Sequence, residues 1–306
     1  MNVLITGGTG LVGKAMTSEL LSQGHSVYIL SRSPDKADSL PQDAQLLRWD
    51  SETVGGWGSI LEEIDGVINL AGSPLNGDGP LDIWLTDKRK KLLIESRLNS
   101  SGALIEGIRT AKHRPKVFIH ASAIGFYGAH GDEIIDESFP AGDDYLAQVQ
   151  YLSEQATKEL DVMNVRKVLI RTGLVLAKNE GALEYFKLQF KLFGGGRLGS
   201  GEQYYSWIHL QDEVSAIRYL LENDLAEGPY NLVAPNPEKN KNFAKIMGKV
   251  MRRPSFMVIP AFLLRMVLGE VATVVLDGQK VTSNRLESLG FKFKFPRLEE
   301  ALRDVL

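Results

Sequence analysis

The chain opens with Val3-Leu4-Ile5-Thr6-Gly7-Gly8-Thr9-Gly10-Leu11-Val12-Gly13, a short apolar run followed by glycines spaced three residues apart. Such a run predicts a buried strand, after which Gly7 lets the chain turn sharply. Gly10 lets the backbone approach a pyrophosphate, and Gly13 lets the next helix pack close to the strand. The phosphate is then bound by unpaired N–H groups at the start of that helix. We therefore expect a dinucleotide site whose contacts come from Gly7, Thr9, Gly10, Leu11, Val12 and Gly13.

The alternative interpretation of these glycines is a tight strand–helix turn without a ligand. The spacing Gly-x-x-Gly-x-x-Gly differs from the common Gly-x-Gly-x-x-Gly, so the motif is weak by itself. The next residues favour a binding turn, because Leu11, Val12, Ala15, Met16 and Leu20 fall on one face of a helix. Gly24 stands where that helix should end, and residues 26–30 predict a second strand.

The end of this second strand indicates which dinucleotide binds. An acidic residue there holds a free ribose 2′-hydroxyl, whereas an arginine accommodates a 2′-phosphate. The chain has Ser31-Arg32-Ser33 at this place. Arg32 could donate to the phosphate or lie over the adenine, and an ordinary exposed arginine is the alternative. The sequence therefore predicts NADP, contacted by Ser31 and Arg32.

Further cofactor contacts are expected where other strands end, because ligands bind at the carboxyl edge of such a sheet. Asp50 could accept a hydrogen bond from the adenine amine, or be an ordinary loop carboxylate. Leu70, Ala71 and Gly72 follow Asn69 and leave space for the ribose. Arg97, on a long predicted helix, could face the cofactor or form an exposed ion pair.

The composition is that of a soluble globular protein, with 43% hydrophobic and 24% charged residues among 306. The net charge of −3 gives no indication of a nucleic-acid surface. The sequence contains no cysteine, which excludes disulfides, thiol nucleophiles and thiolate metal sites. The five histidines lack metal-ligand spacing, so no metal is expected.

The same residues predict the location of the protein. A strand that begins at residue 3 leaves no room for a signal peptide. The apolar stretch 259–276 is interrupted by Arg265 and Glu270 and predicts buried helices, not a membrane span. We expect a cytoplasmic protein with a small-molecule partner and no nucleic-acid or membrane partner; a homo-oligomer is left open.

Strands and helices alternate up to about residue 172, which predicts an α/β fold with a doubly wound parallel sheet. Predicted strands cover 45–49, 66–71, 116–121 and 167–171, and predicted helices cover 85–112 and about 144–163, with Asp143 or Asp144 as an N-cap. Beyond residue 175 the pattern loosens. We expect a Rossmann-type NADP-binding domain over 1–175, whose sheet can recruit later segments, and a smaller C-terminal α/β substrate lobe with terminal helices over 176–306.

Several phrases together resemble one superfamily. They are the glycine turn, Asn69-Leu70-Ala71-Gly72, Ser122 with Phe126-Tyr127-Gly128, Arg171-Thr172-Gly173, and Ser206-Trp207-Ile208-His209 followed by Asp212. This set is similar to the extended short-chain dehydrogenase/reductases, and most of all to their atypical branch of epimerase-family proteins of the nucleoside-diphosphate-sugar epimerase type. The resemblance covers nearly the whole chain and implies a Rossmann core, an NADP-type cofactor and a smaller C-terminal substrate lobe.

The chain departs from that superfamily at its catalytic pair. Typical members use Tyr-x-x-x-Lys with a Ser or Thr, and the lysine lowers the tyrosine pKa. Here Tyr145 is followed four residues later by Val149, and Tyr151 by Gln155. By motif position, the remaining candidate catalytic residues are Ser122, to orient a substrate oxygen, and Tyr127, to donate a proton. Weaker candidates are Tyr204, Tyr205 and His209, for which packing is the alternative role.

Two functions fit this sequence. The first is an NADP-dependent oxidoreductase or epimerase that acts on a small polar or nucleotide-sugar-like substrate without a Tyr-x-x-x-Lys pair. In such an enzyme the cofactor supplies the hydride and the protein supplies orientation, a proton donor and water exclusion. The second is a catalytically silent protein that senses NADP. The sequence favours the enzyme, because its long C-terminal part carries aromatic residues able to line a cleft.

Overall fold

The computed structural model describes residues 1–36, 40–75 and 84–306. Its centre is a seven-stranded sheet in the order β12-β7-β5-β4-β1-β2-β3, in which every neighbouring pair is parallel. Its strands are β1 (Asn2–Thr6), β2 (Ser26–Ser31), β3 (Gln45–Arg48), β4 (Gly66–Asn69), β5 (Val117–Ala123), β7 (Arg166–Thr172) and β12 (Gly228–Leu232). The strand order reverses between β1 and β4, and a dinucleotide binds at such a reversal.

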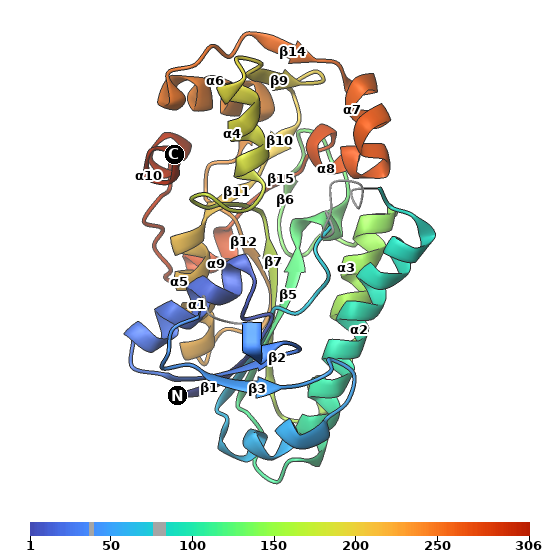
Figure 1. The fold of residues 1–306 in the computed structure, drawn as a ribbon, viewed down its shortest axis with the longest axis vertical. Helices are drawn as coiled ribbons and strands as arrows, with labels where there is room; N and C mark the ends of the chain where they lie inside the picture. The colour runs from blue at the N-terminus through green and yellow to red at the C-terminus, as the bar shows by residue number, and fades with distance from the viewer. Residues whose placement is uncertain (37–39, 76–83) are drawn as a thin grey trace.

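Helices cover both faces of this sheet (Figure 1). The helices α1 (Leu11–Ser22) and α5 (Leu210–Glu222) pack together on one face. The other face is covered by α2 (Asp87–Thr110) and α3 (Tyr145–Gln155), which also contact each other. Strands with both faces covered are apolar throughout: Val3, Leu4 and Ile5 of β1 are all 0% exposed. The predicted doubly wound α/β fold is confirmed.

Local capping signals set the starts of two helices. Thr86 Oγ1 accepts a 3.3 Å hydrogen bond from the Arg89 N–H at the start of α2. Asp144 Oδ1 accepts a 2.9 Å bond from the Ala147 N–H at the start of α3, so of the two residues that the sequence left open, Asp143 and Asp144, the N-cap is Asp144. The predicted helix over 144–163 is shorter, because α3 ends at Gln155 and a 3-10 helix, η4, covers Lys158–Val162.

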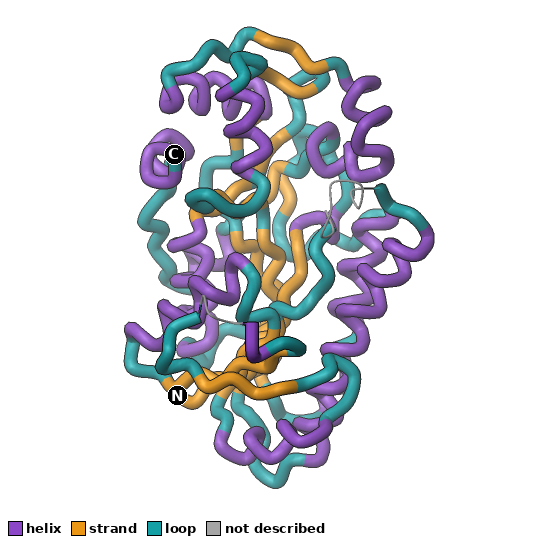
Figure 2. Tube along the Cα trace, in the orientation of Figure 1, coloured by secondary structure: helices purple, strands orange, loops and turns teal. Residues whose placement is uncertain are grey.

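The remaining elements build a smaller part beyond the carboxyl ends of the central strands (Figures 1 and 2). Its strands are β6 (Ile134–Ile135), β8 (Leu174–Leu176), β9 (Gly196–Leu198), β10 (Tyr204–Tyr205), β11 (Trp207–His209), β13 (Glu238–Lys239), β14 (Met257–Ile259) and β15 (Lys280–Val281). Its helices are α4 (Leu183–Lys191), α6 (Asn240–Met251), α7 (Ala261–Leu268), α8 (Ala272–Leu276) and α10 (Leu298–Val305). Buried Phe190, Phe243, Met247 and Leu302 belong to its own core.

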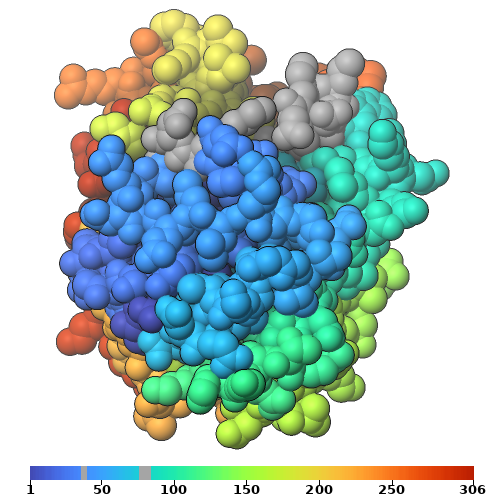
Figure 3. All heavy atoms as spheres, turned by 60° about the horizontal axis from the view of Figure 1, so that its bottom comes forward, coloured from blue at the N-terminus to red at the C-terminus, as the bar shows by residue number. Residues whose placement is uncertain are grey.

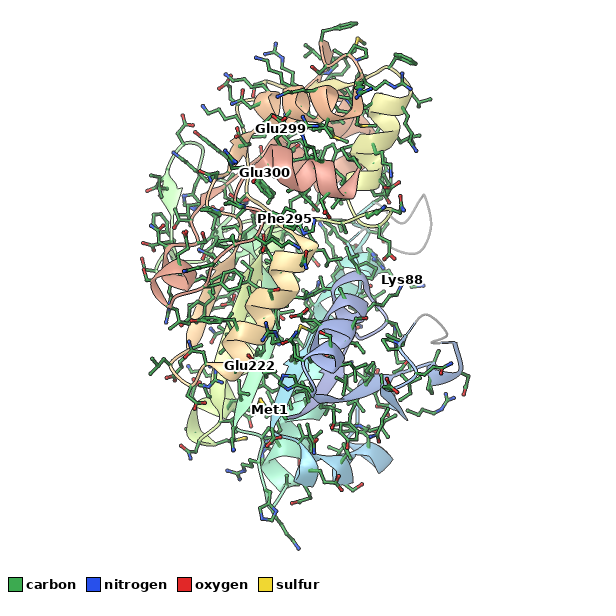
Figure 4. All side chains as sticks on the ribbon, turned by 90° about the vertical axis from the view of Figure 1, so that its left-hand side faces the viewer. Met1, Lys88, Glu222, Phe295, Glu299 and Glu300 are labelled. Carbon is green, nitrogen blue, oxygen red and sulfur yellow. The ribbon has the colours of Figure 1, made fainter. Side chains whose placement is uncertain are left out.

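The chain does not divide cleanly at residue 175. Both α5 and β12 lie beyond that point, yet α5 packs on α1, β12 completes the sheet beside β7, and the short α9 (Asn284–Ser288) contacts β12. Figure 4 shows α5 beside α1, with Phe295 near the start of α5 and Glu222 at its end. The carboxylate of Asp212 in the first turn of α5 accepts 2.8 Å bonds from the N–H groups of Lys294 and Phe295, which ties the terminal segment to this helix.

The prediction of buried helices over 259–276 is wrong for α7. No residue of α7 is buried, and Phe262, Met266 and Val267 are 67%, 64% and 58% exposed. The sequence pattern indicates apolar content, but burial requires a covering surface, and α7 contacts mainly the residues that follow it, 269–276, among those that the structure describes. No helix within those residues is long and apolar enough to cross a membrane. On the face shown in Figure 3, the blue amino-terminal segments and the teal segments of α2 form one continuous surface.

Candidate active site

The glycine turn between β1 and α1 has the geometry of a phosphate cradle. Gly7 has φ +69°, and the Gly10 N–H donates a 3.0 Å bond to the Gly7 carbonyl. A Cβ at Gly7 would lie 2.6 Å from the Leu70 carbonyl oxygen, and one at Gly13 would lie 2.2 Å from the Gly7 oxygen. These two glycines therefore allow the close packing of turn, strand and helix.

Gly10 differs from those two glycines. A Cβ there would meet one atom within 4 Å, the Gly7 oxygen at 3.3 Å, so the backbone at Gly10 faces open space. No side chain caps the start of α1, and its first turn carries no acid. The N–H groups there are available to an anion. The residues present thus fit the pyrophosphate of a dinucleotide, with exposed Thr9 and half-buried Leu11 and Val12 beside it.

Arg32 follows the last residue of β2 and is exposed. The nearby acid Asp35 forms an ion pair with Arg48, whose guanidinium also donates to the Arg32 carbonyl. Arg32 therefore has no ion-pair partner among the described residues. Ser31 Oγ accepts a 3.2 Å bond from the Ser33 N–H, which holds the turn that carries Arg32.

Asp50 has a structural role in its own loop. Its carboxylate accepts bonds from the N–H groups of Glu52 and Thr53, at 2.8 and 2.7 Å, and from the Thr53 hydroxyl at 2.6 Å. Hydrogen bonds from Thr53 lower the pKa of Asp50 to about 2. The carboxylate thus stabilises the turn over 51–53. Its contact to adenine stays a prediction.

Arg97 lies beneath the end of β4. Its Nη1 donates a 2.8 Å bond to the Leu93 carbonyl and a 3.4 Å bond to the Ser73 carbonyl, and a Cβ on Gly72 would lie 3.1 Å from its Cζ. Burial lowers the pKa of Arg97, and no carboxylate pairs with it among the described residues. Within the described part of the chain Arg97 thus forms no exposed ion pair, and its contact to the cofactor stays a prediction. Arg97 joins the segment Leu70-Ala71-Gly72 to a neighbouring cavity.

This cavity of about 390 Å³ lies beyond the carboxyl ends of β5 and β7. Its wall includes Ala123 and Thr172, the last residues of these strands, together with Arg97. In Figure 1 the elements α4, β10 and α8 lie beyond these strand ends, and residues of all three complete the wall. Ligands of open α/β sheets bind outside the carboxyl ends of the strands, so this is the candidate substrate site.

Ser122 and Tyr127 belong to a buried polar network next to the cavity. Ser122 Oγ donates a 2.7 Å bond to Glu154, whose carboxylate also accepts two 2.9 Å bonds from Arg171. Arg171 Nη1 donates to the Tyr127 hydroxyl at 3.0 Å, and that hydroxyl donates to Asn231 Oδ1 at 2.6 Å. This network connects α3, β7, the turn after β5 and β12.

The network corrects the expected catalytic roles. Tyr127 is 0% exposed, and burial raises its pKa to about 12. Its hydroxyl is fully engaged inside the protein, so it does not face the cavity as a proton donor. The Ser122 hydroxyl is directed at Glu154, whereas the cavity wall is formed by the following residues Ala123, Ile124 and Gly125. We therefore assign both side chains to the support of the site.

The helix α3 presents no tyrosine–lysine pair to the cavity. Its cavity side carries Leu146, Val149 and Gln150. Tyr145 donates a 2.7 Å bond to the Lys90 carbonyl on α2, and Tyr151 is 44% exposed. Two weaker candidates, Tyr204 and Tyr205, do line the cavity, but Tyr205 donates its hydroxyl to the Val275 carbonyl at 3.0 Å.

His209, the third weaker candidate, caps a helix. Its Nδ1 accepts a 3.1 Å bond from the Gln211 N–H at the start of α5, and its Nε2 pairs with Asp304 at 3.2 Å. The imidazole stacks on Phe295 with ring centroids 3.9 Å apart. These contacts give His209 a structural role.

Sequence reasoning missed a pair formed by Thr172 and Glu213. Thr172 lines the cavity and donates a 2.7 Å bond to Glu213 Oε1, while Glu213 Oε2 is buried and finds no hydrogen-bond partner in the part of the chain that the structure describes. Burial raises the pKa of Glu213 to about 8. In the sequence, Asp212-Glu213 is an ordinary acidic helix start. The position of Thr172 at a strand end was the available signal.

Comparisons with known proteins agree with this architecture. Residues 3–232 match the NAD dependent epimerase/dehydratase family, and residues 259–305 match a domain of unknown function, DUF1731. An epimerase family protein of Staphylococcus haemolyticus is 38% identical over 304 residues, which cover 99% of this chain and 98% of that protein.

Solved structures show the same likeness. The human epimerase family protein SDR39U1, in a crystal structure with NADPH, is 30% identical with a TM-score of 0.86, over 100% of this chain and 99% of that one. A nucleoside-diphosphate sugar epimerase from Corynebacterium glutamicum is also 30% identical with a TM-score of 0.77, over 100% of this chain and 58% of that one. With a matching family model over most of its length and relatives over nearly all of it, this chain belongs to the NAD-dependent epimerase/dehydratase family.

Proposed function

We propose that the protein is an NADP-dependent oxidoreductase that works without a Tyr-x-x-x-Lys pair. The observation that best supports this function is the position of Arg97. This residue packs under Gly72 beside the glycine turn and also lines the cavity. A cofactor bound along Gly7–Gly13 and Leu70–Gly72 would then reach the cavity at the ends of β5 and β7. When bound, the nicotinamide would supply the hydride.

The preference for NADP rests on Arg32. This exposed arginine stands where the second strand ends, without an acidic partner, and a guanidinium suits the 2′-phosphate. The human relative was crystallised with NADPH, which supports the same choice. Ser31 and its bond to Ser33 hold the turn in place.

The proton for the reduced oxygen is assigned to Thr172. Thr172 lines the cavity, and its hydroxyl contacts Glu213, which keeps its proton at neutral pH because burial raises its pKa to about 8. When Glu213 carries its proton on Oε1, the bond between the two side chains can reverse, so that the carboxyl donates to the threonine oxygen and the threonine hydroxyl is free to donate to a substrate oxygen. A general acid is effective when its pKa lies near the working pH.

The test begins with binding and continues with turnover. Titration of NADPH fluorescence should show binding, and a panel of carbonyl compounds and sugar nucleotides should then be screened by NADPH consumption. Thr172→Val should lower kcat about tenfold or more while the NADPH Kd is unchanged. Thr273→Val is the matched control, because Thr273 lines another part of the wall and donates to the Glu270 carbonyl. Equal kcat values for both variants would contradict the role of Thr172.

A second candidate function is that of a catalytically silent NADP sensor. The residues that α3 presents to the cavity favour it. Its cavity side carries Leu146, Val149 and Gln150, none of which can donate a proton to a reduced carbonyl as an acid. A sensor should bind NADPH and NADP⁺ with different affinities and consume no NADPH with any panel member. Turnover that depends on Thr172 would exclude this candidate.

A further inference from the structure

We propose that the cavity binds an uncharged, largely apolar carbonyl compound and not a sugar nucleotide. This inference rests on the proposed oxidoreductase function and replaces the polar substrate expected from the sequence. The wall of the cavity is largely apolar, carries few positive charges and reaches the protein surface at an apolar residue.

Most of the cavity wall is apolar, and several helices and one strand contribute side chains to it. The apolar side chains come from α2, α3, β8, α4 and α8, namely Leu93, Leu146, Val149, Leu174, Phe186 and Val275. Removing such surface from water favours binding by roughly 25 cal/mol per Å². The polar side chains of the wall, among them Gln150, Thr273 and Gln279, are its smaller part, so most of this surface would leave the hydroxyl groups of a sugar ring without partners, and unpaired buried hydroxyls are costly.

One end of the cavity is an aromatic wall. Phe186 and Tyr205 lie 5.9 Å apart by ring centroid, and each packs against Phe243, at 5.7 and 5.5 Å. The Tyr205 hydroxyl is held by the Val275 carbonyl, and burial raises the pKa of this phenol, so it stays neutral. The cavity therefore presents fixed ring surfaces, which suit a flat apolar molecule.

The charges of the wall oppose a diphosphate. Arg97 is the one lysine or arginine among the described wall residues, and its Nη1 already donates to the carbonyls of Leu93 and Ser73. The wall also carries two carboxylates, Asp144 and Asp277. Burying phosphate charges without paired cations carries a large penalty.

Two lysines lie close to the wall without being part of it. Lys239 Nζ and Lys280 Nζ are 5.2 and 5.3 Å from the ring centroid of Tyr204. Lys239 is engaged by Asp132 and Glu202 at 3.1 and 3.2 Å, and the hydrogen bonds that it donates to these acids raise its pKa. Arg97 in the wall and Lys280 beside it are the cations that a phosphate could use, and substitution of Lys280, which lies outside the wall, becomes an arm of the test.

The apolar wall continues to the outside. Val274 on α8 lines the cavity and is also 49% exposed. Gly269, just before α8, lies against Trp84, which is 49% exposed as well. The wall of the cavity therefore reaches the protein surface at an apolar side chain, Val274. The apolar side chains at the surface thus match the apolar interior of the cavity.

The reaction balances with the cofactor of the proposed function. The bound dihydronicotinamide supplies a hydride with its electron pair to the carbonyl carbon, which breaks the C=O π bond. The oxygen takes one proton by way of the Thr172 hydroxyl, and solvent restores that proton to the Thr172–Glu213 pair. The products are the alcohol and the oxidised cofactor.

The experiment measures binding and turnover separately on the full chain. Calorimetry on protein saturated with NADP⁺ compares two uncharged probes, 1-indanone and menadione, with UDP-glucose and UDP-glucuronic acid. The same four compounds are then offered with NADPH. We expect the uncharged probes to bind and be reduced, and the sugar nucleotides to do neither.

Variants locate that binding in the cavity. Leu146→Glu puts a charge into the wall and should raise the KM for the uncharged probes about tenfold or more, with unchanged NADPH binding as evidence of folding. Leu188→Glu is the matched control, because Leu188 lies on α4, is 55% exposed and should leave the KM unchanged. Lys280→Ala should likewise leave it unchanged.

The outcomes separate the two proposals. If the sugar nucleotides bind, with affinity lost in Lys280→Ala, or if neither uncharged probe binds, the substrate class is overturned while the oxidoreductase function stands. If NADPH itself does not bind, the oxidoreductase function fails. An unchanged KM in Leu146→Glu would place the probes outside this cavity and overturn the inference as well.

Discussion

Arg171 and Glu154 form a buried, two-pronged ion pair directly beneath the candidate site. Arg171 Nε and Nη2 each lie 2.9 Å from a different carboxylate oxygen of Glu154, and the two side chains are 6% exposed. The guanidinium also lies 3.6 Å from the ring centroid of Phe126. This pair fixes α3 against β7 and thereby positions two walls of the cavity.

Breaking this pair should destabilise the fold. Glu154→Ala leaves the Arg171 charge buried without its partner, which costs about 3–5 kcal/mol of unfolding free energy. Glu159→Ala is the control, because Glu159 pairs with Arg109 at the surface, where ion pairs contribute little. Urea denaturation of both variants measures the difference. A Glu154→Ala variant as stable as Glu159→Ala would show that the buried pair is dispensable.

Gly10→Val should abolish NADPH binding with little loss of stability. The side chain would extend into the space reserved for the pyrophosphate, while inside the protein its Cβ meets one oxygen at 3.3 Å. Gly13→Val should instead impair folding, since its Cβ would lie 2.2 Å from the Gly7 oxygen. NADPH fluorescence titration and thermal denaturation distinguish the two effects. Gly102→Ala on α2, where a Cβ meets nothing within 4 Å, is the control expected to keep both properties. Retention of NADPH affinity in Gly10→Val would refute the cradle.

Arg32→Ala should weaken NADPH binding about tenfold to a hundredfold and leave NADH binding nearly unchanged. The lost interaction is a charge-assisted hydrogen bond to the 2′-phosphate, of about 1.5–3 kcal/mol. Calorimetry with both cofactors measures the ratio. Arg48→Ala serves as the control, because Arg48 is committed to Asp35. Equal losses for NADPH and NADH would mean that Arg32 does not discriminate between them.

Glu213 should make the stability of the protein decrease as the pH rises. Burial raises its pKa from 4.5 to about 8, so the folded state keeps a proton that the unfolded chain releases. The unfolding free energy therefore falls between about pH 4.5 and pH 8. Glu213→Gln removes this ionisation and should flatten that slope between pH 6 and pH 9.

Urea denaturation at four pH values tests this dependence. Glu52→Gln is the control, because Glu52 is an exposed residue of the loop after Asp50 and should keep the wild-type slope. A slope in Glu213→Gln as steep as that of the wild type would assign the pH dependence to other groups.

Interpretation of the sequence succeeded where the signal was local. The helix start at Asp143 or Asp144 and the strand predicted at 26–30, which is β2 (Ser26–Ser31), followed from neighbouring residues. It failed for Ser122 and Tyr127, whose places near a strand end suggested chemistry. Their partners Glu154 and Asn231 are 32 and 104 residues away in sequence, so their burial could not be read from motif position.

The sequence by itself determined the strand-turn-helix at Val3–Gly13, the parallel α/β order and the absence of a tyrosine–lysine pair, because each depends on residues close along the chain. Only the tertiary structure decided what the cavity contains. Its wall combines Arg97 from α2, Leu146 from α3 and Phe186 from α4. The buried acid Glu213 owes its retained proton to surroundings assembled from distant segments, since desolvation arises only when those segments pack together.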